Sequence, residues 1–148
     1  MTFETVVTDL YERLPKLKSV ADALFISLIE DRGCQYVVFG SVLLPALEGA
    51  LAARDLGTIL RVCAFLEDAA EAAQQDVRLG ELLRIEVGEW LGSAANEELL
   101  ASWLGAETKR ICNHVPGLAT QRRALREERT AKGIRRRIAA FVNRFKGK

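Results

Sequence analysis

Residues 58–73 read TILRVCAFLEDAAEAA, and their spacing decides the fold class. Apolar residues recur every three or four positions and would share one face of an α-helix, with carboxylates on the other face. These apolar positions are Ile59, Val62, Cys63, Leu66 and Ala70. The same period continues through residues 2–14, 17–31 and 76–91, and no second strand pattern could pair with YVVF at 36–39. The sequence therefore predicts an all-α protein of seven to eight helices.

The boundaries of these helices follow from single residues. Pro15 should end the first helix, because proline disfavours the α conformation of the residue before it. Asp76 should begin the helix that runs to residue 91. In residues 17–31 the predicted core stripe consists of Leu17, Val20, Leu24 and Leu28, which are spaced three or four apart.

The arrangement of the helices has two alternatives. Glu48, Glu67 and Glu89 mark a loose repeat with spacings of 19 residues (48 to 67) and 22 residues (67 to 89). Stacked helical pairs of similar length are typical of a small HEAT/armadillo-like α-solenoid. Because the spacing is uneven, an irregular helical bundle is an equal alternative.

The most apolar stretch is YVVFGSVLLPALEGALAA at 36–53, which contains Gly40, Pro45 and Glu48. A membrane span needs about 20 predominantly apolar residues. We therefore expect a buried core helix, kinked or restarted near Pro45. The chain begins MTFETVVTDLYERLP, with acidic residues and without the apolar core of a signal peptide, which favours a soluble, cytoplasmic protein.

Charge is divided between two parts of the chain, although the formal net charge is only +1. Residues 1–120 hold 10 Lys/Arg against 18 Asp/Glu, a net of −8. Residues 121–148 hold 11 Lys/Arg against two glutamates, a net of +9. The sequence thus predicts an acidic, helical-repeat-like body at 1–117 and a basic helical extension at 118–148.

The extension ends in IRRRIAAFVNRFKGK, which has an amphipathic helical pattern. Its apolar residues are Ile134, Ile138, Phe141, Val142 and Phe145. This stripe predicts a closing helix packed on the body. Phosphate binding is an alternative, and so is docking on an anionic membrane or in a partner's groove. The candidate anion-binding residues are Arg122, Arg123, Arg126, Arg129, Arg135, Arg136, Arg137 and Arg144.

No pattern of catalytic or metal-binding residues appears. The only histidine is His114, and Cys34, Cys63 and Cys112 are widely spaced in apolar contexts, which predicts reduced thiols and no zinc site. No glycine-rich phosphate loop is present. We therefore expect no enzymatic activity, no catalytic residue, no metal and no cofactor.

Two glutamates stand apart because their surroundings are apolar. Glu48 lies in LLPALEGAL and Glu86 in LLRIEVGEW, and we expect both to be half-buried and paired with Arg54 or Arg84. Trp90 and Trp103 are expected in the core. A glycosidase-type acid/base pair would need a cleft and one carboxyl group with a raised pKa, and the sequence indicates neither.

The stretches YERLPKLKSV, YVVFGSVLLPALEGAL, ILRVCAFLEDAA, VRLGELLRIEVGEWL and WLGAETKRI together resemble an uncharacterised family of short, all-helical bacterial proteins. The resemblance covers roughly residues 11–111 and rests on an FG step into a helix, an FLE segment and a Leu-Gly ending before Thr-Lys. Gly88-Glu89 departs from the expected Leu-Glu, and the basic extension lies outside the shared region. Such proteins are similar in size and style to immunity proteins of bacterial toxin systems, which implies an inhibitory role.

The functional hypothesis is a non-enzymatic protein-binding module. It would act as an immunity-type inhibitor whose acidic helix faces occlude a basic partner protein, such as a bacterial toxin domain. The alternative is a nucleic-acid-associated accessory protein that binds phosphates through the C-terminal helix. The acidic residues expected to bind the partner are Glu67, Asp68, Glu71, Asp76, Glu81 and Glu89.

Overall fold

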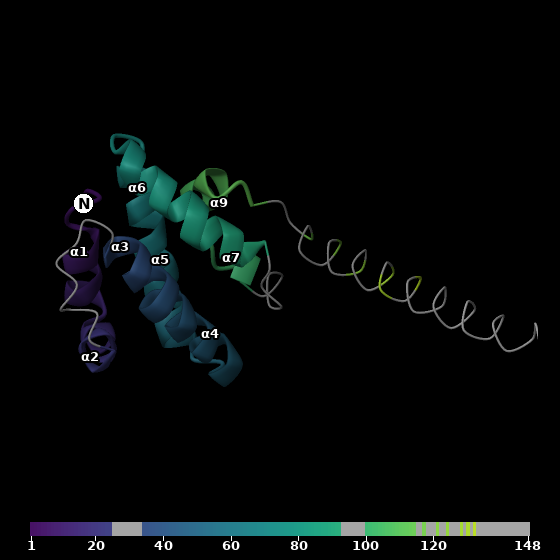
Figure 1. Ribbon diagram of the computed structural model, residues 1–148, viewed down its shortest axis with the longest axis horizontal. Helices are drawn as coiled ribbons and strands as arrows, with labels where there is room; N and C mark the ends of the chain where they lie inside the picture. Colours follow the sequence, from purple (N-terminus) through teal and green to yellow (C-terminus); the bar gives the residue numbers. More distant parts are fainter. Residues whose placement is uncertain are drawn as a thin grey trace, which may run out of the picture.

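The computed structural model describes residues 1–24, 34–92 and 100–114, together with Gly117, Gln121, Ala124, Glu128, Thr130 and Lys132. Within these residues the chain forms six continuous helices and no strand, which confirms the all-α class (Figure 1). Four helices are regular: α1 (Val6–Arg13), α2 (Pro15–Ala23), α5 (Leu56–Ala72) and α9 (Ala106–Ile111). One composite helix joins α3 (Cys34–Val38), η2 (Phe39–Leu43) and α4 (Leu44–Ala53). The other joins α6 (Val77–Leu82), η3 (Leu83–Gly88) and α7 (Glu89–Leu91).

Helix α5 forms the centre of the fold and contacts α1, α4, α6 and α9 (Figure 1). Its predicted apolar face is buried, and Phe65 and Ala69 are buried as well, since neighbouring helices cover more than one side. The Phe65 ring packs against Phe39 of η2 at a centroid distance of 6.2 Å. In a solenoid each unit contacts only its neighbours. Here α1 and α9 both reach α5, and no solenoid is detected in the described part of the chain.

The composite helix Cys34–Ala53 has 20 residues and a mean hydropathy of 1.7, so by length and composition alone it could cross a membrane. In the fold, 39% of its apolar window is buried. Phe39, Leu43 and Leu47 are fully enclosed in the core, so the predicted burial holds for one face of this helix. The predicted restart near Pro45 takes the form of the π-helical turn η2, because proline has no N–H to donate to the turn before it.

The N-terminal helices partly follow the sequence prediction. Leu14 is non-helical and Pro15 opens α2, so the boundary at Pro15 is confirmed. The core stripe predicted for residues 17–31 is confirmed at Leu17 and wrong at Val20 and Leu24, which are 44% and 52% exposed. Helix α2 buries Ala21 together with Leu17, one turn apart, and Leu28 lies outside the described residues.

Only isolated residues of the basic extension are described. Gln121, Ala124, Glu128, Thr130 and Lys132 are helical and exposed, and Lys132 Nζ lies 2.5 Å from Glu128 Oε1. The eight candidate anion-binding arginines and the whole of 134–148 lie outside the described residues. Packing of the extension on the body therefore stays a prediction.

Candidate functional site

A groove with a volume of about 300 Å³ lies between the two composite helices, at the level of their π-helical turns, which contact each other. A π-helical turn inside an α-helix is often found at a functional site. One wall of the groove carries Gly40, Leu44, Pro45 and Glu48, and the other carries Ile85, Glu86, Glu89 and Trp90.

The close approach of the two walls depends on Gly40. A Cβ atom at this position would lie 2.8 Å from Oε2 of Glu86, so the missing side chain leaves room for that carboxylate. Two turns after Gly40 on the same helix, Glu48 joins the two walls directly. Its Oε1 accepts a hydrogen bond from Trp90 Nε1 at 2.6 Å. The groove therefore has acidic groups contributed by both helices.

Glu86 is the carboxyl group most affected by this environment. Burial raises its pKa, and the negative charge of Glu89 raises it further. The expected pairing of Glu48 or Glu86 with Arg54 or Arg84 was wrong for the described residues, among which no such ion pair occurs. Arg54 instead ends α4 in the left-handed conformation, with φ 54°, and is exposed.

The lining determines which ligands fit the groove. Among the lining residues that the structure describes, Trp90 Nε1 is the one side-chain hydrogen-bond donor, and it donates to Glu48. The remaining polar groups are carboxylates, which accept hydrogen bonds, and Leu44, Pro45 and Ile85 supply apolar surface. The complementary ligand is a cation with several N–H donors on an apolar stem, such as an arginine or lysine side chain.

The groove and the raised pKa of Glu86 are also two requirements of a glycosidase-type acid/base pair, neither of which the sequence indicated. Orienting a neutral sugar takes both donors and acceptors, as sites for uncharged ligands usually provide. The described residues of this lining offer mainly acceptors, which complement a cation.

Of the six acidic residues predicted to bind a partner, Glu67 has a structural role. Its Oε1 accepts a hydrogen bond from the Glu107 N–H at 2.9 Å, and its Oε2 accepts from the Thr108 N–H at 2.9 Å and the Thr108 hydroxyl at 2.8 Å. Burial raises the pKa of Glu67, but these hydrogen bonds outweigh it and the pKa lies below the usual value. Glu67 thus fastens the start of α9 to α5.

Asp68 and Asp76 also have partners within the chain. Asp68 forms an ion pair with Arg13 of α1. Asp76 caps α6 by accepting from the N–H groups of Arg78 and Leu79 at 3.0 and 3.1 Å, as the sequence predicted for the start of this helix. Its other oxygen accepts from the Phe3 N–H at 2.7 Å, and this bond is the main cause of its lowered pKa.

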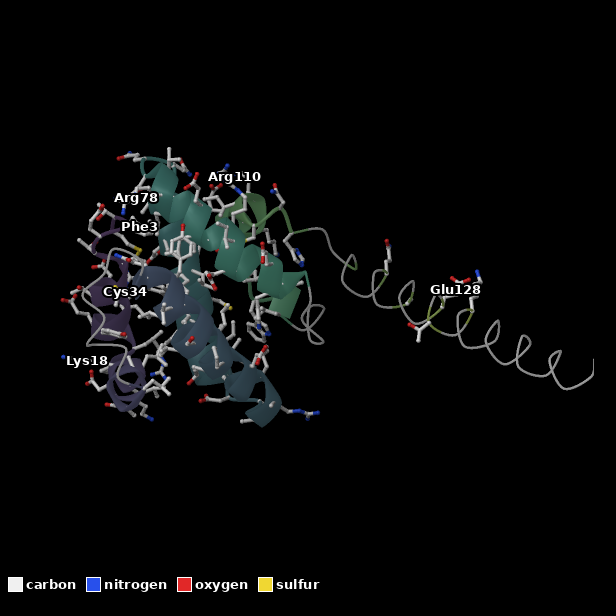
Figure 2. The ribbon with its side chains drawn as sticks, viewed as in Figure 1. Phe3, Lys18, Cys34, Arg78, Arg110 and Glu128 are labelled. Atoms are coloured by element: carbon white, nitrogen blue, oxygen red, sulfur yellow. The ribbon has the colours of Figure 1, made fainter. Side chains whose placement is uncertain are left out.

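The guanidinium of Arg78 adds further contacts to this junction, in which Asp76 at the start of α6 binds the Phe3 N–H. It lies over the Phe3 ring, 4.1 Å from the ring centroid, and contacts Glu4 Oε1 at 2.5 Å (Figure 2). Cation–π and ion-pair contacts of this kind hold the first residues against α6. The carboxylates of this junction therefore stabilise the fold.

The structure assembles a different acidic set from the one predicted. Glu71 and Glu81 are exposed outside the groove, and Glu89 is the one predicted residue that lines it. It lies there with Glu48 and Glu86, which sequence reasoning had assigned to structural pairing. The signal for these two was visible as single carboxylates inside apolar runs, LLPALEGAL and LLRIEVGEW.

The other candidate residues form no second site. Cys34, Cys63 and Cys112 are free, in agreement with the predicted reduced thiols, and burial raises the pKa of Cys63 to about 11 and that of Cys112 to about 12. Within the described residues no group of three or more His, Cys, Asp or Glu could hold a metal. Trp103 is 38% exposed, so its predicted placement in the core was wrong, whereas Trp90 is partly buried against the core and also lines the groove.

Comparisons with known proteins add no functional information. No protein-family model, curated protein or solved structure matches this chain. The resemblance to short, all-helical bacterial proteins stays a prediction.

Proposed function

We propose that this protein is a non-enzymatic binding module that captures a basic segment of a partner protein in the groove between α4 and η3–α7. The observation that carries the proposal is the lining of that groove. Among the described residues of the lining, Glu48, Glu86 and Glu89 contribute three carboxylates, and Trp90 Nε1 donates a hydrogen bond to Glu48. An arginine of the partner brings five N–H donors and a fixed positive charge to this surface.

The electrostatic state of Glu86 favours such a ligand. Its pKa is raised by burial and by Glu89, so the charged form of Glu86 is less stable in the empty groove than in water. A bound guanidinium or ammonium group reverses this effect by pairing with the carboxylates. Partner binding therefore lowers the pKa of Glu86 and stabilises the groove in its fully ionised form.

The apolar part of the groove adds the second component of recognition. Ile85 is 44% exposed, and Trp90 is only partly covered by the core. The methylene stem of a lysine or arginine packs on such surfaces while its head group stays polar. Aromatic residues next to charged groups are common energetic anchors of protein interfaces.

The biological form that we favour is an immunity-type inhibitor that occludes a basic toxin domain. Residues 1–120 carry a net charge of −8, and exposed carboxylates such as Glu71 and Glu81 extend the negative field around the groove. Such a field accelerates capture of a basic protein. Phosphate binding by the C-terminal arginines is supported by no observation on the described residues.

The test compares two variants with equal charge changes. Tagged full-length protein captures partners from its native cells, and a captured basic protein is purified so that its Kd can be measured by calorimetry. The groove variant carries Glu48→Gln, Glu86→Gln and Glu89→Gln. The control variant carries Glu12→Gln, Glu71→Gln and Glu81→Gln, all at exposed positions outside the groove.

Loss of the three groove charges should weaken the partner's affinity by at least about 100-fold, since each close charge pair across an interface contributes on the order of 1–2 kcal/mol. The control should weaken it less than about fivefold, through the loss of long-range attraction alone. Equal losses in both variants would show that net charge, and not the groove, carries binding. An unchanged Kd in the groove variant would reject the proposal.

A further inference from the structure

We infer that the same groove holds the chain's own basic C-terminal segment, residues 134–148, when no partner is bound. The inference rests on the proposed function in that it uses the same groove, but its test needs no partner protein. It would make the segment an intramolecular competitor for the partner.

The chemistry of the segment complements that of the groove. Residues 134–148 contain six cationic side chains and no carboxylate, and their five large apolar residues have helical spacing. The groove offers the carboxylates of Glu48, Glu86 and Glu89 beside the apolar surface of Pro45 and Ile85. A basic amphipathic helix laid in an acidic, partly apolar groove satisfies both sets of groups.

The exit of the chain from the body places the segment within reach. Helix α9 packs against η3 so closely that a Cβ at Gly88 would lie 3.5 Å from the Cα of Cys112. Gly88 stands between Glu86 and Glu89 in the sequence, so α9 ends against the same helix that carries one wall of the groove.

The connecting chain is long enough for the return. The 19 residues 115–133 separate the end of this junction from the segment. They span about 28 Å as a continuous helix and about 60 Å when extended. Gly117, near the start of this connection, has a φ of 74°, a backbone conformation that favours glycine and changes the direction of the chain.

Tethering gives the contact an advantage over any free ligand. A segment linked to its site by a chain of this length acts at an effective concentration in the millimolar range. A partner protein must displace the segment. The partner's measured affinity is therefore its intrinsic affinity multiplied by the fraction of molecules in which the groove is free. Removing the positive charges of the segment should therefore strengthen partner binding.

Trp90 provides the reporter, because it lies in the groove and its indole N–H gives a separate NMR signal. The experiment uses the full-length chain with Trp103→Phe, which leaves Trp90 as the only tryptophan. The segment variant replaces four arginines within 134–148 by glutamine: Arg135, Arg136, Arg137 and Arg144. The matched control replaces four arginines before residue 134: Arg122, Arg123, Arg126 and Arg129.

We expect the Trp90 signal to move in the segment variant and to stay in place in the control. Raising the salt concentration from about 0.05 to 0.5 M should move the wild-type signal towards that of the segment variant, because ions screen the contact. The shift should be independent of protein concentration. A Trp90 signal that is the same in wild type and segment variant would overturn the inference.

Zero-length carbodiimide cross-linking of the full-length protein gives an independent readout. It should join Lys146 or Lys148 to Glu48, Glu86 or Glu89 within one molecule. Cross-links to Glu71 or Glu81 instead, or cross-links only between molecules, would also overturn the inference that the segment binds in the groove. The proposed function fails separately, if a partner's Kd is the same for the wild type and the Glu48, Glu86 and Glu89 glutamine variant.

Discussion

Replacing Glu67 by alanine tests whether this carboxylate fastens α9 to the central helix. Glu67 accepts three hydrogen bonds at 2.8–2.9 Å, two from backbone N–H groups at the start of α9 and one from the Thr108 hydroxyl. Thr108 is fully buried, so water cannot replace the lost acceptor. The substitution thus removes a helix cap and leaves a buried hydroxyl group without its acceptor.

The expected cost follows from these two effects. Loss of a capping side chain destabilises a protein by about 1 kcal/mol. A buried hydroxyl group that loses its partner costs about 1–3 kcal/mol more. Together the free energy of unfolding should fall by about 2–4 kcal/mol, and the Tm by about 6–12 °C. The control is Glu71→Ala, one turn further along α5 at an exposed position, which should change stability by less than about 0.5 kcal/mol.

Urea denaturation followed by circular dichroism measures these changes, and hydrogen exchange at the Glu107 and Thr108 amides locates them. Thr108→Val should cost less in the Glu67→Ala background than in the wild type, because the hydroxyl then has no acceptor to lose. The folded-state pKa of Glu67 is lowered, so its carboxylate stabilises the fold at neutral pH. This stabilisation is lost as the pH falls through the folded-state pKa of Glu67. A Glu67→Ala variant as stable as Glu71→Ala would refute this reasoning.

Three other substitutions test the same contacts. Gly105→Ala places a Cβ atom where the Glu67 carboxyl lies, so it should destabilise about as much as Glu67→Ala, and in chemical denaturation the two should not add. Glu86→Gln should raise the free energy of unfolding at pH 7. A carboxyl group with a raised folded-state pKa makes the folded protein less stable as the pH rises above the pKa of that group in the unfolded chain. The gain over wild type should grow as the pH rises above the usual glutamate pKa of about 4.3 and level off above the raised folded-state pKa, and a difference that is constant with pH would contradict it. Gly40→Ala should displace the Glu86 carboxylate into solvent at little cost in stability, since the contact is with the end of a flexible side chain. Its NMR titration should then show the pKa of Glu86 returning towards the usual value, whereas an unchanged pKa would show that Gly40 does not shape the groove.

Local patterns predicted the features that depend on neighbouring residues. The apolar face of α5, the boundary at Pro15 and the cap at Asp76 each follow from residues within one or two turns of the chain. The stripe of α2 could not be predicted in the same way. Leu17, Val20 and Leu24 all fit the helical period, but the packing of α2 buries Leu17 with Ala21 and leaves Val20 and Leu24 exposed.

The sequence by itself determined the all-α class and the division of the chain into an acidic part and a basic part, because amphipathic period and charge are properties of the linear order. Only the tertiary structure decided which carboxylates have partners. Asp68 meets Arg13, which is 55 residues away, and Glu67 meets the start of α9, about 40 residues away. Glu48 meets Trp90 across 42 residues, and so a groove forms where the sequence suggested only buried ion pairs. These contacts depend on how the helices pack around α5, and no local pattern contains that information.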